Sequence, residues 1–128
     1  MPVKTEYRKN GVILWHEDIV TGEQLIAVNK EIYSHEFQED FQFQLLVLTD
    51  VTEFNVSSRD MKTLADMDTK AERDCKQYAC VVARDDFLFG MSRMWNIQAD
   101  EENFESRVVR EMDEALSWLN SKGIEVKI

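Results

Sequence analysis

Two adjacent serines, Ser57 and Ser58, open the first segment of the chain whose residue types could do chemistry. A hydroxyl before the first turn of a helix accepts a hydrogen bond from a free backbone N–H, and Asp60 three residues on from Ser57 fits a capping box. The same position suits a phosphoryl group or a bound anion, because a helix N-terminus is partially positive. Capping alone is the simpler interpretation, and phosphorylation or anion binding is the functional alternative.

Polar residues also follow two apolar segments, at the points where strands are expected to end. Ligands of an open parallel sheet bind beyond the carboxyl ends of its strands, so these residues are expected at one edge, with Arg110 nearby. Turn formation and helix capping explain the aspartates without any ligand. The residues are Asp50, Thr52 and Glu53 after the first segment, and Arg84, Asp85 and Asp86 after the second.

Paired carboxylates can transfer protons, which makes a hydrolase with Asp50 or Asp85 as its base the rival hypothesis. No nucleophile or set of metal ligands accompanies these residues in the sequence, and no cofactor or metal is expected. His16 stands next to Glu17 and Asp18, but a lone histidine at a strand end is usually an ordinary surface group. The residues therefore favour a protein that is not an enzyme.

A cluster of aromatic and methionine side chains occupies residues 87–95. Helical spacing places Leu88, Met91 and Trp95 on one stripe and leaves other members off it, so the helix is apolar over a wide arc. Such a helix is deeply buried, or it lines a pocket or a partner surface, and these side chains suit adaptable apolar ligands. Core packing is the preferred interpretation. The cluster consists of Phe87, Phe89, Met91, Met94 and Trp95.

The elements that must position these residues start with the segment from Phe41 to Thr69. A short apolar run at about 42–48 predicts a strand buried on both faces, followed by a helix from Ser57 to about Cys75. A second buried strand is expected at 78–83. The helix after it begins at Asp85–Asp86 and fades out over 96–98, with Gly90 as a weak point.

The remaining elements lie at the two ends of the chain. Asn10–Gly11 is a strong signal for a two-residue hairpin turn, and Thr21 with Gln24 predicts a helix start. The expected elements are strands at about 4–8 and 12–15, a helix from the Thr21 cap to about Ser34, a short strand at 106–109 and a helix at 111–122 that stops at Gly123. This order predicts an α/β fold in one domain, residues 1–128. Its single-layer, mainly parallel sheet has about five strands, an N-terminal antiparallel hairpin and four helices.

The composition and net charge of the chain disfavour some classes of binding partner. The 128 residues are 44% hydrophobic and 31% charged, a balance typical of a globular domain. Lys plus Arg is 15 and Asp plus Glu is 25, a net charge of −10 that disfavours nucleic acid and anionic membrane surfaces. The sequence has no apolar run of signal-peptide or membrane-spanning length, and the expected location is the cytoplasm with Cys75 and Cys80 reduced.

The element order, together with LLVLTDVTEFNVSSRDM, VVARDDFLFGMSRMW and VVREMDEALSWL, resembles the STAS superfamily, and within it the SpoIIAA-like, STAS/SEC14-type branch. In the anti-sigma-factor antagonists of that family a serine at the start of this helix is phosphorylated, and Ser58 stands in its place. Val56 and Arg59 replace the acid and the glycine of the family segment. Relatives in the wider branch are associated with apolar small molecules and lipids.

The resemblance and the residues together lead to one preferred function. It is a non-catalytic cytoplasmic binding or regulatory module, which engages a protein partner or a small apolar ligand near the N-terminus of the second helix. The rival hypotheses are the hydrolase and a purely structural subunit, a homodimer for example, with Trp118 as a contact residue. The expected surface consists of Asp50, Thr52, Arg84, Asp85, Phe87, Met91, Met94 and Trp95.

Overall fold

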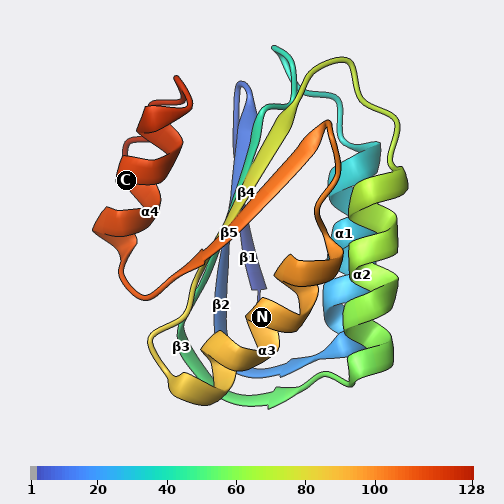
Figure 1. Cartoon of the computed structure of the whole chain (residues 1–128), viewed down its shortest axis with the longest axis vertical. Helices are drawn as coiled ribbons and strands as arrows, with labels where there is room; N and C mark the ends of the chain where they lie inside the picture. Colours follow the sequence, from blue (N-terminus) through green and yellow to red (C-terminus); the bar gives the residue numbers. More distant parts are fainter. Residues whose placement is uncertain (1–2) are drawn as a thin grey trace.

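The computed structural model describes residues 3–128 and builds them around one five-stranded sheet (Figure 1). The strands lie in the sheet in their sequence order, and only the first pair is antiparallel. The predicted mixed, mainly parallel α/β sheet with an N-terminal hairpin is confirmed. The strands are β1 (Val3–Arg8), β2 (Gly11–Thr21), β3 (Phe43–Asn55), β4 (Gln77–Val82) and β5 (Phe104–Val109).

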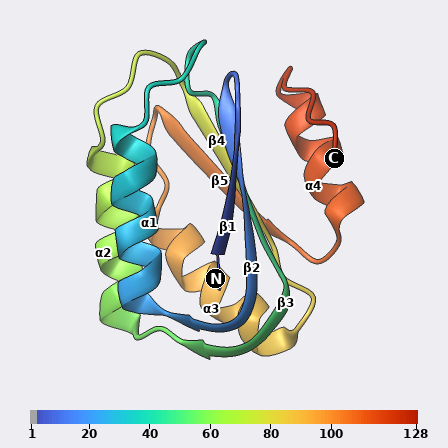
Figure 2. The same ribbon diagram turned by 180° about the vertical axis from the view of Figure 1, so that it is seen from behind.

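Three of the four helices cover one face of the sheet, and the last helix covers the other (Figures 1 and 2). Each of the first three follows a strand and leads into the parallel neighbour of that strand, and crossovers of one hand bring such helices to the same side. Across residues 3–128 no helix has the length and apolar character needed to cross a bilayer. The helices are α1 (Gly22–Ser34), α2 (Ser58–Lys70), α3 (Asp86–Gln98) and α4 (Met112–Ser121).

The sheet separates two apolar cores. Alternate residues of a strand point to opposite faces, so Ala79 and Val81 of β4 pack toward α2 and α3 while Cys80 and Val82 pack toward α4. On the α4 side Trp118 is only 9% exposed, and its ring meets that of Tyr78 edge-on at 6.0 Å. Trp118 is thus a core residue of this chain, and the expectation that it is available for a dimer contact is wrong.

The hairpin turn differs from the one expected at Asn10–Gly11. Arg8 pairs with Gly11, so Lys9 and Asn10 form the turn, and in residues 3–128 only Asp18 and Gly123 have positive φ. Gly11 is needed for close packing instead, because a Cβ there would lie 2.2 Å from a ring carbon of Phe43.

The second helix is shorter than predicted, ending at Lys70 and not near Cys75. Ala71 has extended backbone angles, and its N–H makes the last helical bond, to the Met67 carbonyl. The chain then turns so that Arg73 donates to the backbone carbonyl of Asp68 and stacks over the Phe104 ring at 5.0 Å. These contacts hold residues 71–76 as a loop, which helical periodicity does not reveal.

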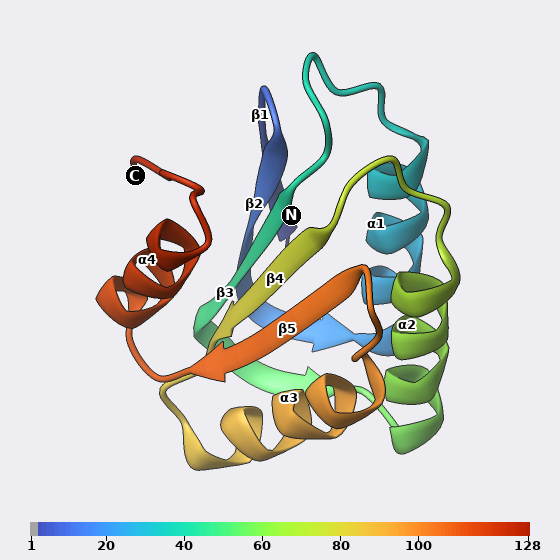
Figure 3. The ribbon, with the colours of Figure 1, turned by 45° about the horizontal axis from the view of Figure 1, so that its top comes forward.

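Strands β2 and β3 are both longer than predicted, because their ends pair with each other beyond the end of β4. We call these paired ends, Glu17–Thr21 and Asp50–Asn55, the β2–β3 extension. One register shift lies immediately before it and a second lies within it, after Asp18. Bulges of this kind bend strands, and the extension curves beneath the sheet toward the starts of α1 and α2 (Figure 3). Only Val20 and Phe54 are buried in it, so the apolar pattern is too sparse to predict it.

Candidate ligand-binding cavity

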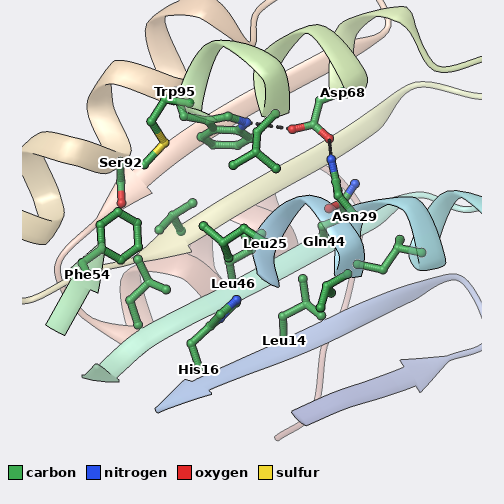
Figure 4. A pocket seen from close by; sticks show the side chains of 16 residues that line it. Leu14, His16, Leu25, Asn29, Gln44, Leu46, Phe54, Asp68, Ser92 and Trp95 are labelled. Carbon is green, nitrogen blue, oxygen red and sulfur yellow. Dashed lines mark hydrogen bonds between the residues drawn. The ribbon is translucent and has the colours of Figure 1, made fainter. Parts of the chain in front are cut away.

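A cavity lies between the sheet and the helices α1, α2 and α3 (Figure 4). Its volume is about 60 Å³, room for a few water molecules at roughly 10–15 Å³ each or for a small organic group. Most of the wall is apolar and includes Leu14, Leu25, Leu46, Phe54 and Trp95. Leu46 lies on the central strand yet is only half-buried, because its side chain faces this space.

Polar side chains of the cavity gather around Asp68, on α2. One carboxylate oxygen accepts hydrogen bonds from Asn29 Nδ2 at 3.1 Å and from the Tyr33 hydroxyl at 2.8 Å. The other oxygen accepts from Trp95 Nε1 at 2.7 Å, as Figure 4 shows. Burial raises the pKa of Asp68, and these hydrogen bonds offset part of that rise. Three donors therefore engage the carboxylate, and it ties α1, α2 and α3 together.

The network continues from Tyr33 to the sheet. The Tyr33 hydroxyl donates to Asp68 and accepts from Gln44 Nε2 of β3 at 3.1 Å. Burial, with the neighbouring carboxylate, raises the pKa of Tyr33 far above its usual range, so the phenol stays protonated. Gln44 is thereby the link between the strand below the cavity and the helices above it.

His16 also lies in the cavity wall but, unlike Asp68, its side chain has no hydrogen bonds within residues 3–128. Its ring points from β2 into the cavity (Figure 4), the residue is 3% exposed, and neither ring nitrogen has a hydrogen-bond partner. Burial lowers the pKa of His16 to about 4. The backbone carbonyls of Leu14 and Val47 act in the opposite direction, although neither has hydrogen-bond geometry to the ring. The imidazole is therefore neutral at pH 7, with one N–H donor and one acceptor nitrogen free.

The expectation that His16 is an ordinary surface group is wrong. Val12, Leu14 and His16 alternate along β2 and share its helix-covered face, and the period of two extends that face by one residue past the predicted strand end. Asp68 and Asn29 were also missed. Each lies four residues after an apolar position on the inner face of its helix, Leu64 and Leu25 respectively, and helical spacing is the signal that would have found them.

The structure places the two serines at the start of α2. The Ser57 hydroxyl accepts from the Asp60 N–H at 3.1 Å, and the Asp60 carboxylate accepts from the Ser57 N–H at 3.1 Å. The capping box is therefore formed as the sequence indicates. Ser58 is exposed on the first turn, and its phosphorylation stays a prediction.

The polar residues after β4 and β5 come together in ion pairs at one end of the sheet. Arg84 pairs with Glu111 at 3.0 Å, and Arg110 donates to the Asp86 carboxylate at 2.6 Å. Arg110 also donates to the Arg84 carbonyl, while Asp85 caps α3 by accepting from the Leu88 N–H at 3.0 Å. Within residues 3–128, no hydrogen bond or ion pair joins this group to Asp50 or Thr52, which are exposed on the β2–β3 extension.

The cluster on α3 divides between the interior and the surface. Trp95 lines the cavity, Met91 and Met94 are half-buried, and Phe87 is 59% exposed. Of the side chains expected to form a binding surface, only Trp95 reaches the cavity. Within residues 3–128 no group of three or more His, Cys, Asp or Glu side chains is arranged to hold a metal ion.

Comparison with protein-family models found no match, and comparisons with curated proteins and with solved structures found none either. The resemblance to the STAS superfamily stays a prediction from the motifs.

Proposed function

We propose that the protein is a non-catalytic binding module that takes up a small, largely apolar molecule in the cavity between the sheet and α1–α3. The main support is the cavity itself. Protein interiors are close-packed, whereas here a space bordered by Leu14, Leu25, Leu46 and Phe54 stays open beside a half-buried Leu46 side chain. Mostly apolar walls with a few polar groups are typical of small-molecule sites.

The state of the carboxylates favours binding over catalysis. Asp68 is occupied by three hydrogen-bond donors and serves the packing of the helices. Asp85 is engaged as a helix cap, and Asp50 lies outside the cavity wall. A general base must reach the proton that it removes, and neither Asp50 nor Asp85 faces the cavity. We place the module in the cytoplasm, in keeping with the free thiols of Cys75 and Cys80.

A protein partner on the outer face of α3 is the second candidate. Phe87 and Ile97 are 59% and 70% exposed on this helix, whereas Trp95 of the same helix lines the cavity. A partner that binds α3 would therefore contact the helix that also contributes Trp95 to the cavity wall. This link would make the module regulatory. It would allow both expected partners, a small apolar ligand in the cavity and a protein on α3, to bind the same molecule.

Xenon binding tests the cavity, because small apolar cavities take up this atom without any polar contact. We expect xenon to shift the NMR signals of residues around Leu46 in the wild type. The variant Leu46→Trp fills the space and should lose those shifts, while Leu116→Trp, at a half-buried position on α4 across the sheet, should keep them. A wild-type spectrum unchanged by xenon would remove the basis of the proposed function.

Native mass spectrometry asks whether the protein already contains a ligand. The protein is expected to carry a small molecule that is released on activation and is absent from Leu46→Trp. A folded wild type that binds xenon but releases nothing would show that the cavity of the purified protein is empty, which would count against a tightly held natural ligand. The released mass, when present, gives the size of the natural occupant.

A further inference from the structure

His16 is a buried polar side chain of the cavity wall that packing does not explain. A buried polar group without a hydrogen bond costs roughly 1–3 kcal/mol, and both nitrogens of this ring are in that state. The side chain points into the cavity and not between packed helices (Figure 4). Of the other polar side chains of the wall, Asn29 donates to Asp68 and Gln44 donates to Tyr33, whereas Ser92 has no side-chain hydrogen bond within residues 3–128.

Water is a poor partner for His16 in this position. A buried water needs about two to four polar contacts. Most side chains of the cavity wall, including Leu14, Leu46 and Phe54, offer none, and among the polar ones Asn29, Gln44 and Asp68 are already hydrogen-bonded to one another or to Tyr33 and Trp95. A ligand is better suited, because its apolar part can contact these side chains while one polar atom meets the ring. The free imidazole nitrogens are therefore complementary to a molecule with a single polar end.

The charge state of the ring narrows the class of molecule. At pH 7 His16 is neutral, because burial lowers its pKa to about 4. A carboxylate or an ammonium group would bring a net charge into an apolar space without an opposite charge beside His16, which is costly. A hydroxyl group both donates and accepts, so it can pair with His16 whichever nitrogen carries the proton.

We propose that His16 is the polar anchor of the cavity, and that the ligand is a compact, uncharged alcohol whose hydroxyl pairs with the imidazole while its hydrocarbon part contacts Leu14, Leu46 and Phe54. This inference rests on the proposed function. It adds the chemical class of the ligand and the side chain that selects it.

The test compares three probes of similar length, butan-1-ol, 1-chlorobutane and butyrate, on the wild type and on His16→Leu at pH 7. Affinities come from NMR titration of the amide signals. Chlorobutane is more apolar than butanol and binds an apolar cavity better for that reason alone. We therefore divide the affinity for the alcohol by the affinity for the chloride in each protein and compare the two ratios. We expect this ratio to be about tenfold higher in the wild type, the size of one hydrogen bond to a buried partner, and butyrate not to bind.

The imidazole itself supplies a second measurement that does not need a variant. Addition of butan-1-ol should shift the ¹⁵N signals of the His16 ring, whereas 1-chlorobutane should leave them nearly unchanged. Equal ratios of alcohol to chloride affinity in the two proteins would show that the cavity binds apolar molecules without His16 as an anchor. His16 ¹⁵N signals that do not shift when butan-1-ol is added would show the same. If neither neutral probe nor xenon binds, the proposed function and the inference fail together.

Discussion

At the scale of single residues, the two buried titratable side chains of the cavity are held in different ways. Asp68 has three hydrogen-bond donors around it, and His16 has no partner. A buried carboxylate with hydrogen-bond donors around it can hold helices together. A buried neutral ring without hydrogen-bond partners lowers the free energy of unfolding. The structural role therefore falls to Asp68, and His16 is the residue whose presence a ligand would explain.

The first prediction concerns His16 and pH. Its pKa is about 4 in the folded protein against 6.5 for the free side chain. Between these values the unfolded chain binds more protons, so the stability of the fold rises with pH through this window and is lost on acidification. Relative to His16→Leu, the wild type should lose about 3 kcal/mol between pH 7 and pH 4, measured by urea unfolding.

The comparison must be the difference between the two proteins. Burial raises the pKa of Asp68, and a raised carboxyl pKa favours the fold at low pH, which opposes the effect of His16. Subtracting the curve of the variant removes this contribution, since Asp68 is present in both. Parallel stability curves for the wild type and His16→Leu would show that the ring is accessible to protons in the folded state.

At the scale of elements, the second prediction concerns the hydrogen bonds that join α1, α2 and α3. In Asp68→Asn one carboxylate oxygen becomes an NH₂ group, which would face a donor, either Trp95 Nε1 or the donors Asn29 and Tyr33. We expect a loss of about 2–4 kcal/mol in the free energy of unfolding. Asp66→Asn on the same helix removes only exposed ion pairs with Lys62 and Lys70 and should cost under about 0.5 kcal/mol. Equal effects would contradict this role for the network.

The third prediction concerns the glycine in the middle of α3. Gly90 is exposed, its φ lies in no region that requires glycine, and a Cβ there would have no atom within 4 Å. Gly90→Ala should therefore raise the free energy of unfolding by about 1 kcal/mol through helix propensity. Gly11→Ala is the counterpart, because its Cβ would meet the Phe43 ring, and it should destabilise the fold. Thermal unfolding of both variants checks the signs.

Periodicity in the sequence is enough to predict the layered architecture, but it misses much of the site. Apolar runs such as Leu45–Leu48 and capped starts such as Ser57 depend on local residues, so strands and helices could be placed. In the β2–β3 extension only Val20 and Phe54 are buried, because β2 and β3 pair there only with each other and β4 has already ended. His16 lies one residue past the predicted end of its strand, where the alternation of Val12 and Leu14 continues, but a polar side chain does not by itself indicate a buried position.

At the scale of the whole molecule, the two faces of the sheet differ in what packs against them. The face toward α1–α3 contains the cavity and the polar network, whereas the face toward α4 is packed with apolar side chains around Leu45, Val47 and Leu119. The helix α4 stands alone on its side (Figure 2). Changes in the α4 layer should therefore alter stability without altering the cavity.

The last prediction tests this separation with Trp118→Ala. Removing a large buried side chain should lower the free energy of unfolding by roughly 3–5 kcal/mol, because Trp118 packs against Tyr78 in the α4 layer. The molar mass in solution should stay that of the wild type, since the residue is buried within its own chain, and the protein that remains folded should bind xenon with unchanged affinity. Light scattering, urea unfolding and xenon titration measure the three quantities. A variant that keeps its stability but changes its mass would show that Trp118 contacts a second copy, and one that loses xenon binding while folded would show that the two faces are coupled through the sheet.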